Sequence, residues 1–194
     1  MTRLMIMAGS IFLCAALSSC GNSATRNDEQ KDTTDSVLSD AGTVDPVALD
    51  RERGDTSFVL HAASSGMAEV NLANLALRQS ANAEVKAFAE KMIADHGAAN
   101  KKLQQLAAHH QIVLPESLAE KHKKIYDDLS SRKAAEFDLA YANVMVESHR
   151  EALALMKTGA ESLEHEDLKQ YAKQTTPVIS KHLEHAQELQ RSVR

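Results

Sequence analysis

Three histidines and one glutamate stand out as residues whose type and position can support chemistry. His96 and His182 fall at core-facing positions in the apolar patterns of two different predicted helices. His149 lies beside the apolar seam of a third helix, and Glu69 borders the seam of a fourth. A helical bundle can bring such side chains together, and imidazoles with a carboxylate form a donor set for zinc, copper or iron. We therefore treat these four residues as candidate ligands of a transition metal.

Two aspartates are candidates for hydrogen bonds that orient these histidines. Asp95 and Asp138 are close enough in sequence for their carboxylates to accept ring N–H groups. The competing interpretation is structural, because a buried histidine usually hydrogen-bonds to a facing polar group and fixes the helix register. The sequence alone favours this structural polar layer and leaves the metal site as the alternative.

A ferritin-type di-iron centre is not supported by the sequence. Such a centre normally needs Glu-x-x-His on two helices, and none of the nine histidines has a glutamate three residues before it. The close pairs His109–His110 and His182–His185 are weaker candidates, and of these His109 and His185 are expected to be exposed. There is also no Gly-rich phosphate loop, nucleophile elbow or Ser-His-Asp spacing. We assign no catalytic residue, and the sequence favours a protein that is not an enzyme.

The elements that must position these residues are predicted to be helical. Hydrophobic residues make up 43% of the 194 residues, and Gly and Pro are few, as is typical of a globular helical domain. From Thr56 onward, apolar residues recur at spacings of three and four, the pattern of an amphipathic helix. This pattern predicts helices over about 56–80, 85–111, 115–129, 131–159 and from 166, the last kinked or restarted at Thr176-Pro177.

The number and length of these segments define the fold class. Four long amphipathic helices with short connections predict an all-α four-helix bundle, with the helix at 115–129 as an additional short element. The formal net charge of the chain is −5. It gives no reason to expect a nucleic-acid partner, which would require a basic face.

The first 20 residues are predicted to be a targeting signal and not part of the fold. Arg3 precedes an apolar run at 4–17 that has the length of a signal peptide and is too short for a comfortable transmembrane helix. Leu17-Ser18-Ser19-Cys20 resembles the lipobox of bacterial lipoproteins, which implies cleavage after residue 19 and lipid attachment to Cys20. The alternative is a secreted protein cut at another small residue. Gly21 in place of Asp predicts the outer membrane under the enterobacterial sorting scheme, with the domain facing the periplasm.

A tether is predicted between the lipidated cysteine and the bundle. Residues 21–55 contain nine acidic and four basic residues and no sustained apolar period. Such a segment cannot bury enough apolar surface to offset the entropy of ordering it. We therefore expect residues 20–55 to be a disordered acidic tether, with a root-mean-square span of roughly 30 Å.

Several motifs of the helical region resemble the DUF4142 family, a bacterial domain of unknown function. The resemblance covers about 56–194 and implies a ferritin-like helical bundle, but it supplies no activity. The motifs that carry it are Phe58-Val59, Gly66-Met67-Ala68-Glu69, Val85-Lys86-x-Phe88-Ala89-x-x-Met92, Asp95-His96, Leu114-Pro115, Phe137-Asp138-x-x-Tyr141, Met145-Val146-x-x-His149 and Pro177-x-x-x-x-His182-Leu183.

Two functional hypotheses follow from the sequence. The first is a lipid-anchored, non-enzymatic protein of the cell envelope that binds another envelope component or has a structural or stress-related role. The second is a metal-binding or redox bundle of the periplasm, which uses Glu69, His96, His149 and His182. The sequence gives no cofactor beyond this possible transition metal.

Overall fold

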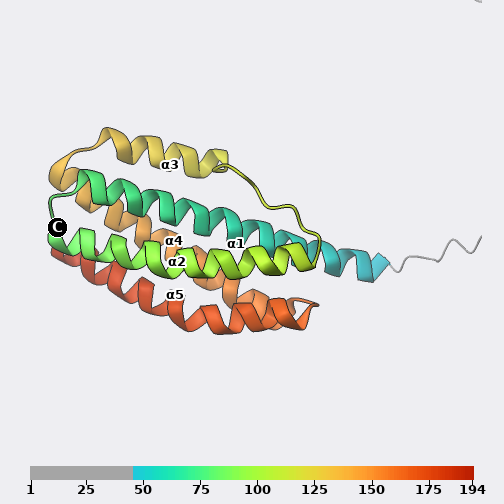
Figure 1. The fold of residues 1–194 in the computed structure, drawn as a ribbon. Helices are drawn as coiled ribbons and strands as arrows, with labels where there is room; N and C mark the ends of the chain where they lie inside the picture. Colours follow the sequence, from blue (N-terminus) through green and yellow to red (C-terminus); the bar gives the residue numbers. More distant parts are fainter. Residues whose placement is uncertain (1–45) are drawn as a thin grey trace, which may run out of the picture. The chain divides into compact units, whose positions relative to one another are not determined.

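The computed structural model describes residues 46–194, with side chains from Gly54 onward. Over these residues it contains no strand and five helices: α1 (Pro46–Gln79), α2 (Ala83–His109), α3 (Glu120–Ser131), α4 (Ala134–Ser162) and α5 (Glu166–Ser192) (Figure 1). The predicted all-α class is confirmed. None of the helices in this part of the chain is long and apolar enough to cross a membrane. The predicted signal peptide, Cys20 and the tether up to residue 45 lie outside the described residues.

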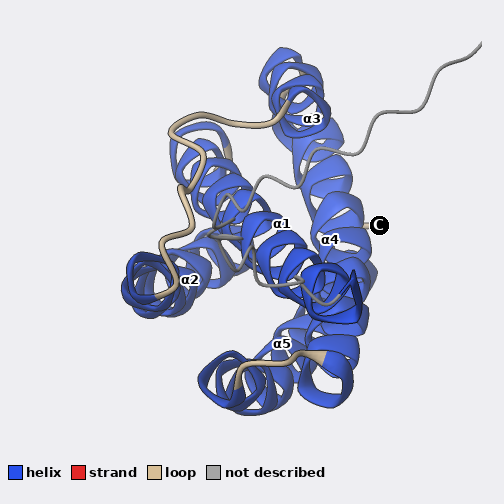
Figure 2. Ribbon diagram, turned by 90° about the vertical axis from the view of Figure 1, so that its right-hand side faces the viewer, coloured by secondary structure: helices blue, strands red, loops and turns tan. Residues whose placement is uncertain are grey.

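The four long helices form a bundle in which each packs against two neighbours. α1 packs against α2 and α4, and α5 packs against α4 and α2. Short connections make α1–α2 and α4–α5 antiparallel hairpins (Figure 1). The longer connection between α2 and α4 contains α3, which lies on the outside of the bundle against α1 and α4 (Figure 2). The predicted four-helix bundle with one additional short helix is therefore confirmed.

A polar layer divides the interior of the bundle into two apolar clusters. On α4, for example, Met145 belongs to the first cluster and Ala152 to the second, and His149 lies between them. The same alternation occurs on the other long helices, at Glu69, His96 and His182. The larger side chains of the first cluster are Leu72, Phe88, Met92, Phe137, Tyr141 and Met145, and those of the second are Phe58, Leu103, Met156, Leu168, Tyr171 and Ile179.

Two helices begin at other residues than the sequence predicts. α1 begins at Pro46, ten residues before the predicted start at Thr56, so the last part of the predicted tether is helical. Proline is favoured in a first helical turn. The start at Pro46 was nevertheless not predicted, because the residues that follow it have no apolar period. α3 begins at Glu120 and not at Pro115. The chain before it stays non-helical while Ile112 and Leu114 pack against the second apolar cluster.

The last helix does not restart at Thr176-Pro177, because α5 continues through Pro177; the alternative, a kink at this point, stays a prediction. Proline cannot donate to the carbonyl four residues before it, which here belongs to Lys173. Both Lys173 and Pro177 are exposed, so water can satisfy that carbonyl. One turn is also tied by Thr176, whose hydroxyl donates to the carbonyl of Ala172 at 2.8 Å.

Candidate metal centre

Each of the four long helices contributes one side chain to the polar layer. Glu69 comes from α1, His96 from α2, His149 from α4 and His182 from α5. All four are buried, with exposed fractions between 0% for His149 and 5% for His96. Apolar side chains on both sides of the layer fix its depth along the bundle axis. All four residues predicted from the sequence as ligands are therefore gathered in one place in the core.

The three imidazoles converge on a common point. One ring nitrogen from each of His96, His149 and His182 lies within 4.8 Å of those of the other two. The ring centroids form a nearly equilateral triangle, with 5.2 Å between His96 and His182 and 5.5 Å for each of the other two pairs. Glu69 is not among the converging atoms. Its Oε2 lies 2.9 Å from His96 Nδ1, and its Oε1 lies 3.7 Å from His149 Nδ1.

Each imidazole has one nitrogen held by an oxygen atom. His96 Nδ1 is paired with Glu69, His149 Nδ1 lies 2.7 Å from the backbone carbonyl of Met145, and His182 Nε2 lies 2.7 Å from Asp95 Oδ2. An N–H donated to these oxygen atoms fixes the tautomer and leaves a lone pair on the opposite nitrogen. Those opposite atoms are the buried nitrogens without a hydrogen-bond partner: His96 Nε2, His149 Nε2 and His182 Nδ1.

The two aspartates expected to support the histidines differ in their position. Asp95 does so, since it accepts the hydrogen bond of His182. Asp138 is buried, but the hydrogen bonds found for the three imidazoles in the described chain go elsewhere. The carbonyl of Met145 was not foreseen as an anchor. Its position four residues before His149 on the same helix is the signal that would have indicated it.

Burial and charge set the protonation of the cluster in opposite directions. Burial lowers the pKa of His182 to about 4 and, with the charge of His96, lowers that of His149. Burial also opposes the charge of His96, but the Glu69 carboxylate outweighs it and raises the pKa of His96. For Glu69, burial raises the pKa, but His96 together with His149 and His182 more than reverses this shift. Two imidazoles are therefore neutral near pH 7, the form that binds metal ions.

The distances can be compared with the needs of a metal ion. A tetrahedral zinc ion lies about 2.0–2.1 Å from each imidazole nitrogen, which sets the nitrogens about 3.4 Å apart. One nitrogen of each ring lies within 4.8 Å of those of the other two, so at most small ring movements would bring the three nitrogens to that spacing around an ion. The buried oxygen atoms that lack a hydrogen-bond partner among the described residues include Glu69 Oε1, Asp138 Oδ1 and Tyr141 Oη.

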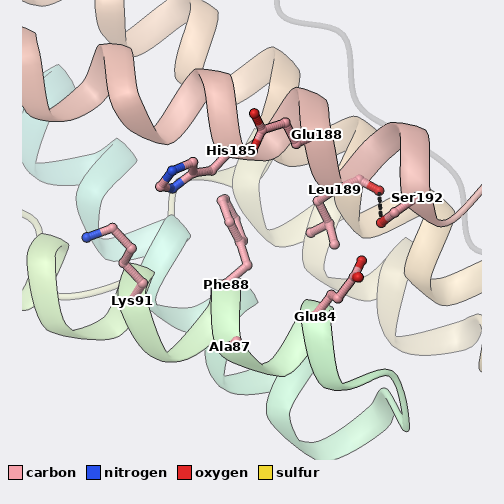
Figure 3. Close-up of a pocket in the computed structure, with 8 residues that line it drawn as sticks. All are labelled: Glu84, Ala87, Phe88, Lys91, His185, Glu188, Leu189 and Ser192. Carbon is pink, nitrogen blue, oxygen red and sulfur yellow. Dashed lines mark hydrogen bonds between the residues drawn. The ribbon is translucent and has the colours of Figure 1, made fainter.

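A surface pocket lies close to the cluster, between α2 and α5. It has a volume of about 490 Å³, and Phe88 is one of its lining residues. Phe88 projects from α2 and His185 from α5 into this space (Figure 3). The ring of Phe88 is 7% exposed and its centroid lies 6.3 Å from that of His149. Phe88 thus stands between the pocket and the polar layer.

The fold and the buried cluster define a four-helix-bundle protein with three convergent imidazoles in its core. The chain belongs to the DUF4142 family, described as a domain of unknown function, which matches residues 43–189. The crystal structure of a DUF305 fragment from Deinococcus radiodurans is similar in fold. Its TM-score is 0.63 at 14% sequence identity, over 71% of this chain and 96% of that one. No curated protein matches the chain.

Proposed function

We propose that this protein binds one transition-metal ion between His96, His149 and His182. The observation that carries the proposal is that each ring is anchored through one nitrogen, while the opposite, buried nitrogen has no partner. Metal-bound histidines in proteins have this arrangement, with the second ring nitrogen held by a carboxylate or a carbonyl. Glu69 then acts as the outer partner of His96 and not as a ligand.

A purely structural polar layer accounts for these contacts less well. Such a layer is stabilising when its polar atoms are satisfied, and each buried unsatisfied group costs about 1–3 kcal/mol. Here three ring nitrogens and Glu69 Oε1 lack a hydrogen-bond partner within a single layer. One metal ion would satisfy the three nitrogens together, which is why we now favour metal binding over the structural interpretation.

The donor set limits the class of ion. Neutral imidazole suits zinc, copper, iron and nickel, whereas calcium and magnesium prefer oxygen ligands. Three protein ligands leave a further coordination position open. The position is enclosed in the core, so we propose binding or storage of the ion and not turnover of a substrate.

The metal content of the purified protein tests this function. The protein is purified without chelators or an affinity tag and its metal is measured by elemental analysis, with one ion per chain expected. His149→Ala and His182→Ala should each remove it, whereas the control His61→Ala, at an exposed position on α1, should keep it. Metal-free protein that gains no thermal stability when zinc or copper is added would contradict the proposal.

A milder variant separates loss of metal from loss of fold. Asp95→Ala leaves all three ligands in place and removes the acceptor that orients His182, together with the exposed ion pair of Asp95 with Lys91. The Asp95 side chain is 32% exposed, so we expect the variant to fold. Loss of such an outer partner typically weakens metal binding about 10–100-fold. An affinity equal to that of the unmodified protein would argue against the assigned role of Asp95.

We also propose that the bundle is anchored to a membrane of the cell envelope through lipid on Cys20. The support is the lipobox-like Leu17-Ser18-Ser19-Cys20 after an apolar run of signal-peptide length. Two or three acyl chains would make this anchoring stable. Metabolic labelling with a fatty acid should mark the protein and should fail for Cys20→Ala. Labelling retained in that variant would overturn the assignment.

A further inference from the structure

A second group of histidines and carboxylates lies where α2 ends and α5 begins, at one end of the bundle (Figure 1). His109, His110 and Asp167 each offer one ligand atom, and these atoms lie within 4.8 Å of one another. His109 is thirteen residues beyond His96 on α2, which corresponds to about 20 Å along a helix. The group is therefore separate from the core centre.

His110 is at the middle of this group. Its Nε2 lies 3.0 Å from both carboxylate oxygens of Asp167. Its ring centroid is 4.9 Å from that of His109 and 4.2 Å from that of His165. These residues, except Asp167, also line a pocket of about 260 Å³. Three imidazoles thus line one hollow of the surface, and the Asp167 carboxylate contacts the ring of His110.

Two local structures hold these side chains in place. At the end of α2, Gln111 adopts a positive φ of 56°. Ile112 N–H then donates to the carbonyl of Ala107 at 2.8 Å, the geometry of a Schellman motif. This motif fixes the backbone at the end of α2 and therefore the positions from which the His109 and His110 side chains project.

The buried Asp55 holds the other side of the pocket. Its carboxylate accepts the backbone N–H groups of Glu164 and His165 at 2.9 Å each and lies 2.6 Å from His165 Nδ1. It therefore ties α1 to the start of α5. Because this contact uses Nδ1, Nε2 is the nitrogen of the His165 ring that does not contact Asp55.

We propose that His109, His110 and Asp167 bind a second divalent transition-metal ion, with His165 at the rim of the same pocket. The ion takes the place of the proton between His110 Nε2 and Asp167. The negative end of the α2 dipole favours a cation here. Because Asp167 is 40% exposed and His109 is also exposed, this ion exchanges with solvent and binds more weakly than the ion in the core.

Calorimetric titration of the chelator-treated protein with zinc tests the second site. The unmodified protein should bind two ions per chain with clearly different affinities. His110→Gln and Asp167→Asn should each weaken the lower-affinity event at least tenfold and leave the tighter one unchanged. The control His185→Ala changes an exposed histidine elsewhere on α5 and should leave both events unchanged.

The two sites can fail independently of each other. The weaker event should persist in His149→Ala, where the core site is removed, so it remains measurable even if the core proposal is wrong. A single binding event in the unmodified protein that His149→Ala abolishes would overturn the second site. An unchanged weaker event in both His110→Gln and Asp167→Asn would also overturn it and would leave these contacts as an ordinary surface hydrogen bond.

Discussion

Replacing Glu69 with glutamine should destabilise the metal-free protein, and the size of the loss should depend on pH. Glu69 is 2% exposed, and its Oε2 lies 2.9 Å from His96 Nδ1, which is also buried. Removing one partner of a buried ion pair costs about 3–5 kcal/mol. The amide oxygen of glutamine can still accept one hydrogen bond, worth about 1 kcal/mol. We therefore expect a loss of about 2–4 kcal/mol in the free energy of unfolding.

The sign of the pH dependence follows from the two pKa shifts. The pKa of His96 is raised above its ordinary 6.5, so its contribution is complete below 6.5 and is lost as the pH rises through the folded value. The pKa of Glu69 is lowered from its ordinary 4.5, so its contribution is present above 4.5 and is lost as the pH falls through the folded value. The effect of Glu69→Gln should be largest between these two ordinary values.

Urea denaturation with chelator present, at pH 5.5, 7 and 9, measures this effect. The control Glu151→Gln removes one partner of an exposed pair with Lys121, in which both side chains are more than half exposed. It should cost less than about 1 kcal/mol. If Glu69→Gln cost the same at pH 5.5 and pH 9, or no more than the control, the ionised buried pair inferred from the structure would be refuted.

Two further substitutions test the packing of the two apolar clusters, since Phe58 belongs to the second and Tyr141 to the first. A Cβ atom at Gly159 would lie 2.6 Å from Cε2 of the buried Phe58, so Gly159→Ala should destabilise by about 1–3 kcal/mol. The control Gly97→Ala, in a helix with nothing within 4 Å, should instead stabilise by about 0.5–1 kcal/mol; the same sign for both in thermal denaturation would contradict this packing. Tyr141→Phe removes a buried hydroxyl that has no partner, so the metal-free variant should be at least as stable as the unmodified protein. A loss above about 1 kcal/mol would reveal a hydrogen bond of that hydroxyl.

The helices could be predicted because their causes are local. Apolar residues at spacings of three and four define the buried faces of α1, α2, α4 and α5, whatever packs against them. The same periodicity placed His96 and His182 towards the core, and both are buried. Helix boundaries were predicted less accurately from the sequence. Whether Pro115 begins a helix and whether Pro177 interrupts one depend on exposure and on the packing of neighbouring residues, which the local sequence does not contain.

The candidate metal centre was likewise predictable from the sequence only in part. The sequence by itself determined which residue types lie in the core and on which helices, because periodicity fixes the face of each one. Only the tertiary structure decided how the rings are turned: Glu69 pairs with His96, Asp95 holds His182, and one nitrogen of each ring lies within 4.8 Å of those of the other two. Helix rotation, register and side-chain rotamers set these orientations, and they depend on contacts between residues far apart in the chain. The cluster of His110 with Asp167 became visible for the same reason, since these residues are separated by 57 positions and meet only in the folded bundle.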